Sequence, residues 1–193
     1  MAAKSTLLNM ALCLTAVCLI CSAVLGGVYG LTKAPIDAAA QKALTESISA
    51  VLPEGGELSQ SNASELEGVD EYYVLSENGS PKAYAVKSST NGFGGTLTIM
   101  VGVLADGTVY NTSVLAHSET PGLGAKCAEA DSDFRTQFQN FNGHLAVKKD
   151  GGDIDAITAS TITSRAFTKA VEQAVKLVKS IPTINSEEET SNE

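Results

Sequence analysis

The sequence predicts an α+β protein in which a single N-terminal transmembrane helix precedes a domain with an antiparallel sheet and packed helices. Residues 5–32 contain no charged side chain, and this run is longer than the roughly 20 apolar residues that cross a bilayer core. Two pairs of alternating segments flank Asn78-Gly79 and Asp106-Gly107, which are dipeptides typical of hairpin turns. Residues 164–181 repeat apolar or small side chains with a helical period.

These observations divide the chain into four parts. They are the N-terminal segment and transmembrane helix at 1–32, a juxtamembrane helix and linker at 33–70, the folded domain at 71–183, and an acidic tail at 184–193. A cleavable signal peptide usually has an apolar region of about 7 to 15 residues, so the longer run is interpreted as an uncleaved, single-pass anchor. Lys4 and Lys33 lie on opposite sides of it, and charge therefore does not decide its orientation.

The composition excludes several classes of partner and site. The 22 acidic residues outnumber the 13 basic ones, which argues against nucleic acid or anionic lipid as a partner. Cys127 is the one cysteine outside the apolar run, so no disulfide within the domain is expected. The other three, Cys13, Cys18 and Cys21, either pack on a helix face, which we favour, or ligate a cluster with other subunits. Two histidines without paired ligand spacing predict no metal site.

Each element is predicted from local patterns. Pro35 suits the first turn of a second helix that ends at Pro53, and residues 54–70 are an acidic, glycine- and serine-rich loop. Four strands are expected at 71–76, 82–88, 96–104 and 109–116. A short helix at 133–141 should place Phe134, Phe138 and Phe141 in the core, and a third hairpin should join 145–147 to 154–157. Residues 184–193 are expected to be disordered.

The stretch from Asp155 to Ser164 has five hydroxyl side chains in seven residues, directly before the predicted C-terminal helix. One interpretation is that Thr161, Thr163 or Ser164 caps this helix. The other is that the helix N-terminus binds an anion, because its free N–H groups and dipole favour negative charge, including a phosphate esterified to one of these hydroxyls.

Two glycine-rich segments precede this stretch. Residues 91–95, Asn-Gly-Phe-Gly-Gly, lead into a strand rather than a helix, so they lack the context of a dinucleotide fingerprint or a P-loop, but they can bring the backbone close to a ligand. Residues 117–126 read His-Ser-Glu-Thr-Pro-Gly-Leu-Gly-Ala-Lys. Taken alone, this segment is a turn in which Pro121 fixes one φ angle and Gly122 and Gly124 supply permissive ones.

The hydroxyl stretch resembles a known acceptor motif. Asp155, Thr158, Ala159, Ser160 and Thr161 match D-x-x-S/T-G-A-T/S, found in proteins to which FMN is joined through its phosphate. Ala159 stands where glycine is usual and Ser160 where alanine is usual. Both replacements are small, although a positive φ at position 159 would be strained.

Together with the H-x-E-T-P-G-L-G pattern at 117–124, this motif resembles the G subunit of the Rnf electron-transport complex, over residues 92–178. The related C subunit of the sodium-pumping NADH:quinone oxidoreductase shares the acceptor motif but is typically longer. The resemblance implies an FMN-binding domain on the extracytoplasmic side of the inner or plasma membrane. The domain would carry electrons in a complex that couples ferredoxin:NAD electron transfer to Na⁺ or H⁺ translocation, with other membrane subunits and a flavin transferase as partners.

The same resemblance implies that Thr161 carries the FMN and that the chain itself supplies no catalytic residue. It suggests as further cofactor-binding candidates Thr158, Ser160, Thr163, His117, Glu119, Thr120, Leu123 and Gly124. His117 and Glu119 would either contact the flavin or order their loop. The alternatives are a C-type subunit, a membrane-anchored assembly subunit without flavin, and a hydrolase using Ser118 or Ser160 with His117 and a carboxylate. The hydrolase is disfavoured because no nucleophile-elbow pattern is present.

Overall fold

The computed structural model describes residues 7–61 and 67–190 and divides the chain into two units, Met1–Ala43 and Leu44–Glu193. Helix α1 (Leu7–Val51) supplies the described part of the first unit and contains one stretch long and apolar enough to cross a membrane. The predicted break before Pro35 is wrong, because Pro35 lies inside α1. A proline removes one helical hydrogen bond, and the alanines at 38–40 that follow it are among the best helix formers.

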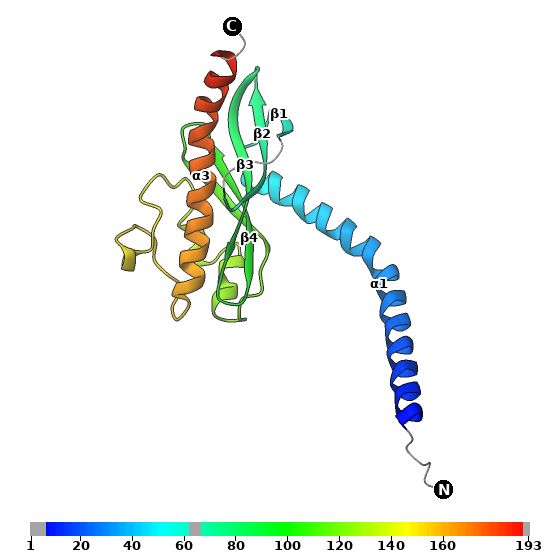
Figure 1. Ribbon diagram of the computed structural model, residues 1–193. Helices are drawn as coiled ribbons and strands as arrows, with labels where there is room; N and C mark the ends of the chain where they lie inside the picture. The colour runs from blue at the N-terminus through cyan, green and yellow to red at the C-terminus, as the bar shows by residue number, and fades with distance from the viewer. Residues whose placement is uncertain (1–6, 62–66, 191–193) are drawn as a thin grey trace. The chain divides into compact units, whose positions relative to one another are not determined.

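The second unit is built on a five-stranded antiparallel meander (Figure 1). Its strands, in spatial and sequence order, are β1 (Glu57–Ser61), β2 (Val69–Glu77), β3 (Ser80–Asn91), β4 (Thr96–Leu104) and β5 (Val109–Ala116). Both predicted hairpins are confirmed, and at the first turn Asn78 and Gly79 have φ of 53° and 78°, as a type I′ turn requires.

Strand β1 lies within the segment predicted to be a loop, so that prediction is wrong for Glu57–Ser61. This strand pairs along its length with β2. Its sequence, Glu-Leu-Ser-Gln-Ser, contains one large apolar residue and no regular alternation. Pairing with the neighbouring strand therefore determines its conformation, and the local sequence gives no signal for it.

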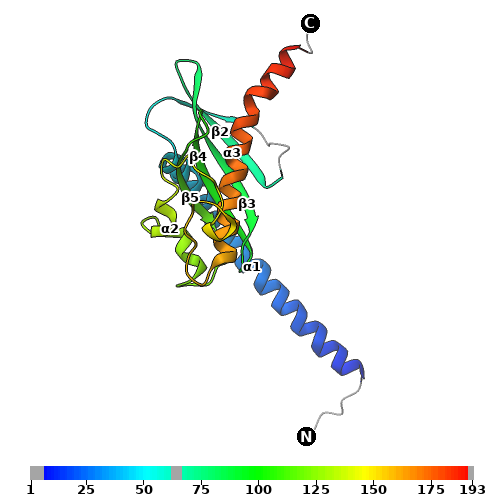
Figure 2. The same ribbon diagram turned by 90° about the vertical axis from the view of Figure 1, so that its left-hand side faces the viewer.

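Both faces of the sheet are covered. Helix α3 (Thr161–Thr190) lies along one face, as Figures 1 and 2 show, and buries Phe167 and Val171 against Tyr84 and Val86 of β3 and their neighbours. On the other face, the last turn of α1 places Ile48 and Val51 against a second cluster that includes Ala83, Ala85 and Met100. Neighbouring residues of β3 thus serve different clusters, as the pleat of a strand requires.

The contact between α1 and the sheet requires a glycine in β4. A Cβ added at Gly102 would overlap the carbonyl group of Val51. Glycine therefore permits the close approach that buries Val51 completely.

The connections after β5 differ in part from the expectation. Helix α2 covers only Asp133–Thr136, but Phe134 and Phe138 are buried and their rings contact that of Phe167, so their prediction as core is confirmed. Phe141 is partly buried and packs against the same cluster. The third hairpin is wrong. Val147 and Ile154 form one isolated parallel bridge, because the 3₁₀ turn η2 (Lys148–Asp150) and Gly151, with φ of 85°, redirect the chain between them.

The acidic end of the chain continues α3. The segment from residue 184 was expected to be disordered, but the helix extends through Thr190. Glutamates at 187–189 are good helix formers, and they follow directly on a helix that the sheet already stabilises. Residues 191–193 lie outside the described part of the chain.

Thr112 on β5 provides a test of core packing. Its side chain is buried, and its hydroxyl has no hydrogen-bond partner among the described residues. Thr112→Val removes this hydroxyl while keeping the branched shape, so it should raise the free energy of unfolding by about 1 kcal/mol in a urea titration of the detergent-solubilised chain. Thr98→Val is the matched control, because the Thr98 hydroxyl lies 3.1 Å from that of Ser89. Equal shifts in the two variants would contradict this account.

Candidate functional site

A cavity of about 380 Å³ opens where the 92–95 turn and the 117–124 loop meet the start of α3. It is lined by Phe93, Glu119, Thr120, Leu123, Gly124, Ala159, Ser160, Thr161, Ile162 and Thr163. The structure therefore brings together most of the residues that the sequence suggested, from segments about 40 residues apart. His117 and Thr158 are not among the lining residues.

The start of α3 sets the position of the hydroxyl side chains. The helix begins at Thr161, and the carbonyl of Ser160 accepts from the Ser164 N–H at 3.0 Å. Ser160 thus occupies the N-cap position, and the interpretation in which Thr161, Thr163 or Ser164 caps the helix is wrong. The Ser164 hydroxyl instead lies inside the first turn, where it donates to the Ser160 carbonyl at 2.9 Å and accepts from the Ile157 N–H at 2.9 Å.

Thr161 therefore sits at the first helical position, half-buried in the cavity wall. The first N–H groups of an α-helix have no partner within the helix, and the residues that carry them here line the cavity. An anionic group bonded to Thr161 would be adjacent to these donors and to the positive end of the helix dipole.

Glu119 connects the three segments of the cavity. Its side chain is 6% exposed. One carboxylate oxygen accepts from the N–H groups of Phe93 and Gly94 at 2.8 and 3.2 Å, and the other accepts from the Thr163 hydroxyl at 2.7 Å. A buried carboxylate is costly unless its oxygens are paired, and here both are. Of the two roles left open for Glu119, these contacts favour ordering of the loop.

His117 acts on the same loop from outside the cavity. Its Nδ1 accepts from the Glu119 N–H at 3.2 Å, and the side chain is otherwise exposed. Gly124 permits the close approach of Glu119 and Thr163, because a Cβ at position 124 would overlap both the Glu119 carboxylate and the Thr163 hydroxyl. The loop glycine is therefore explained by close packing as well as by turn geometry.

Three large apolar side chains remain exposed around the cavity. They are Phe93, Leu123 and Ile162, with exposed fractions of 70%, 43% and 52%. Sequence patterns did not place Phe93, Ile162 or Ala159 among the site residues. The signal that could have placed Phe93 at the site was its position in the glycine-rich turn. Ile162 lies between two threonines, and no sequence pattern distinguished it. The cavity thus combines polar donors at the helix end with an apolar rim.

Ala159 adopts the strained conformation that its place in the motif suggested, with φ of 60°. A left-handed conformation costs an L-residue with a Cβ roughly 1–2 kcal/mol, and glycine avoids this cost. Glycine also increases the conformational entropy of the unfolded chain, which offsets part of the stabilisation. Ala159→Gly should therefore raise the free energy of unfolding by up to about 1 kcal/mol. Ala156→Gly is the control, because Ala156 lacks a positive φ, and it should lower stability. The opposite order in a denaturant titration would contradict the strain argument.

Cys127 lies in the 3₁₀ helix η1 (Gly124–Ala128), which continues from the cavity loop. It is fully buried, and burial together with the Glu119 charge raises the pKa of its thiol to about 11. The thiol is therefore protonated at neutral pH and serves as a small core residue rather than as a nucleophile.

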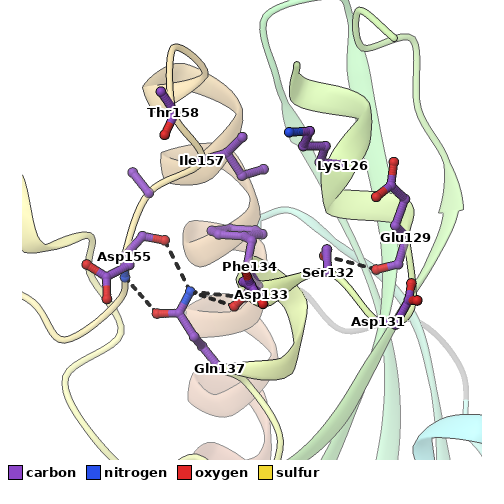
Figure 3. A pocket seen from close by; sticks show the side chains of 11 residues that line it. Lys126, Glu129, Asp131, Ser132, Asp133, Phe134, Gln137, Asp155, Ile157 and Thr158 are labelled. Carbon is purple, nitrogen blue, oxygen red and sulfur yellow. Dashed lines mark hydrogen bonds between the residues drawn. The ribbon is translucent and has the colours of Figure 1, made fainter. Parts of the chain in front are cut away.

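Asp155 and Thr158 face a different hollow, of about 450 Å³, between the acceptor motif and the 126–137 segment (Figure 3). Its wall includes Lys126 and the acidic residues Glu129, Asp131 and Asp133. The Asp155 carboxylate pairs with Lys148 at 2.7 Å, and both side chains are mostly exposed. The motif thus spans two hollows, with Thr161 in one and its first residues in the other.

The chain is similar to known proteins over the segments that form the cavity. The model of the FMN-binding domain family matches residues 92–176. The chain is 35% identical over 169 residues to the G subunit of the proton-translocating ferredoxin:NAD(+) oxidoreductase complex of Clostridium ljungdahlii, covering 86% of this chain and 88% of that protein. It is 42% identical over 113 residues to the G subunit of the ion-translocating oxidoreductase complex of Vibrio atlanticus, covering 55% of this chain and 54% of that protein.

The match to some relatives is partial. The match spans 54% of the Vibrio atlanticus protein. The corresponding G subunit of Erwinia tasmaniensis is 38% identical over 117 residues, and that match covers 57% of this chain and 56% of the other. The chain thus spans about half the length of these two relatives. Among solved structures, the C subunit of the Na(+)-translocating NADH-quinone reductase of Parabacteroides distasonis has a TM-score of 0.45 and 24% identity. That comparison covers 63% of this chain and 77% of the other.

Proposed function

Because the chain belongs to the family of G subunits of ion-translocating oxidoreductase complexes, we propose that it is an electron carrier with FMN joined through its phosphate to Thr161. The complex would couple electron transfer between ferredoxin and NAD to movement of Na⁺ or H⁺. The observation that carries the proposal is the place of Thr161, which is the first residue of α3 and half-buried in a cavity with an apolar rim. The C-type alternative is not favoured, since relatives matched over most of their length are G subunits.

The residues around the cavity suit both ends of FMN. The helix start supplies N–H donors for a phosphoester on Thr161. The exposed side chains of Phe93, Leu123 and Ile162 offer apolar contact to a flat ring, as is usual for cofactor sites with few polar groups. The isoalloxazine would supply the redox chemistry, and the protein would fix its position and surroundings.

Attachment requires one redox-neutral transfer. The Thr161 hydroxyl oxygen forms a bond to the flavin-side phosphorus of FAD, and the bond from that phosphorus to the bridging oxygen of the diphosphate breaks. AMP leaves with the bridging oxygen, and the hydroxyl proton passes to a base of the flavin transferase. The exposed motif residues Thr158 and Ala159 leave a path for the Mg²⁺-dependent transferase to approach.

The membrane placement rests on α1 and on the family. The apolar stretch of α1 would anchor the chain as a single-pass protein of the inner or plasma membrane, in contact with other membrane subunits of the complex. The folded domain would lie on the extracytoplasmic side. Covalent attachment would prevent loss of the flavin in a compartment where free flavin is scarce.

The experiment that tests the proposal is intact-mass analysis of the full chain expressed with and without a flavin transferase. We expect a mass gain of one FMN less one water only with the transferase, and yellow colour that survives denaturation. An unmodified mass in the presence of an active transferase would favour the alternative of a flavin-free assembly subunit.

A further inference from the structure

The side chain of Gln137 holds the first residue of the acceptor motif. Its Oε1 accepts from the Asp155 N–H at 2.8 Å, and its Nε2 donates to the Asp155 carbonyl at 3.2 Å. The two residues are 18 positions apart in the chain, and both bonds appear in Figure 3. One primary amide thus satisfies both backbone groups of Asp155, as a neighbouring strand would.

Gln137 is itself fixed in place. It follows α2 directly in the chain, and its near neighbours in sequence, Phe134 and Phe138, are buried. Their rings pack against each other and against Phe167 of α3. Its Nε2 also lies within hydrogen-bond distance of the Asp133 and Phe134 carbonyls, at 3.1 and 3.4 Å. The amide is therefore held by backbone carbonyls of α2 on one side and holds the motif on the other.

The motif has few other restraints at this end. Regular pairing stops at the bridge between Val147 and Ile154. From Asp155 to Ser160, the hydrogen bonds to backbone groups within the described part of the chain are few. They are the Gln137 pair, the bond of Ile157 N–H to the Ser164 hydroxyl, the turn from Ser160 N–H to the Ile157 carbonyl, and the bonds that the Ser160 carbonyl accepts from the Ser164 N–H and hydroxyl. Among the described residues, Gln137 is thus the one side chain from outside this stretch and α3 that hydrogen-bonds its backbone, whereas Lys148 pairs with the Asp155 carboxylate, which is mostly exposed.

We infer that Gln137 is a positioning residue for flavin transfer, which holds the Asp155 backbone so that the 155–161 loop presents Thr161 in one orientation. This inference rests on the proposed function. Without the two bonds, the Asp155 N–H and carbonyl are left to water, and the loop between Ile154 and α3 gains alternative conformations. A displacement of about 1 Å at a reacting group can cost on the order of 100-fold in rate, so a looser loop should slow transfer.

Gln137→Glu is the sharpest variant, since it keeps the shape and the acceptor for the Asp155 N–H. It removes the N–H donors and turns a carboxylate oxygen toward the carbonyls of Asp133, Phe134 and Asp155, three acceptors. Gln137→Met removes both hydrogen bonds without adding charge. The matched control is Gln139→Glu, the same chemical change at an exposed residue that does not line the motif hollow.

Two measurements on the detergent-solubilised full chain, prepared without flavin, test the inference. Hydrogen exchange followed by mass spectrometry should show faster exchange in 155–161 for both Gln137 variants, and not for Gln139→Glu. Labelling with FAD, Mg²⁺ and flavin transferase should fall about tenfold in kcat/KM for the chain as acceptor, and remain unchanged in Gln139→Glu.

If Gln137 had a purely structural role, its variants would slow labelling only by lowering the overall stability of the domain. Gly102→Ala lowers stability at a site far from the motif in the chain, and below its unfolding transition it should be labelled at the wild-type rate. The inference is overturned if exchange in 155–161 does not change, or if it rises while both Gln137 variants label like the wild type. Failure of the wild type to accept any label would instead refute the proposed function, while the exchange result would still decide whether Gln137 restrains the loop.

Discussion

Thr161→Ala is expected to abolish covalent flavin labelling while the domain remains folded. Only an oxygen at this position can form the phosphoester, and the neighbouring hydroxyls are placed differently. Thr161 is the first helical residue and not the cap, so alanine, the best helix former, should change the free energy of unfolding by less than about 1 kcal/mol. In-gel flavin fluorescence after denaturation and circular dichroism measure the two effects.

The neighbouring hydroxyls provide graded controls. Thr161→Ser keeps an acceptor oxygen and should retain partial labelling. Thr158→Ala alters an exposed residue outside the cavity, so it should weaken labelling at most. Thr163→Ala removes the bond to Glu119 and should weaken it further without abolishing it. Flavin recovered from Thr161→Ala and mapped to Thr158, Ser160 or Thr163 would disprove the assignment.

The sheet could be predicted where local chemistry defines it. Asn78-Gly79 and Asp106-Gly107 fix two tight turns, and the strands on either side alternate. Bounds for β4 and β5 were therefore predicted to the residue. β1 was missed because its conformation depends on pairing with β2, and the third hairpin was wrong because apolar runs at 145–147 and 154–157 fit several tertiary arrangements equally well.

The candidate site also divides into features that a local pattern predicts and features that depend on the fold. The hydroxyl stretch and the 117–124 loop are local patterns, and the family resemblance that they carry implies that both belong to one cofactor site. The contacts that organise the cavity are not local. Glu119 reaches Phe93 across 26 residues and Thr163 across 44, and Gln137 reaches Asp155 across 18. A single sequence contains no pattern that pairs such residues, so their roles required the fold.

Glu119→Ala is expected to be the most destabilising single change at the site. It leaves the buried Thr163 hydroxyl without its acceptor, and it removes the partly buried bonds of the Phe93 and Gly94 N–H groups. An unsatisfied buried polar group costs about 1–3 kcal/mol, so the free energy of unfolding should fall by about 2–3 kcal/mol in a urea titration of the full chain in detergent. Labelled protein should still form but absorb differently, since two segments of the cavity wall shift.

Glu119→Gln separates the geometry of this contact from its charge. The amide oxygen can accept from both backbone N–H groups, and the amide nitrogen can donate to the Thr163 hydroxyl once that hydroxyl rotates. We therefore expect the free energy of unfolding to fall by about 1 kcal/mol, because neutral hydrogen bonds are weaker.

His117→Ala removes one hydrogen bond of 3.2 Å at an exposed residue, so it should lower the free energy of unfolding less than Glu119→Ala does. Equal unfolding free energies for the Glu119→Ala and His117→Ala variants would contradict the structural role of the carboxylate. Complete loss of labelling in Glu119→Ala, with the domain still folded, would instead assign the loop to recognition by the transferase.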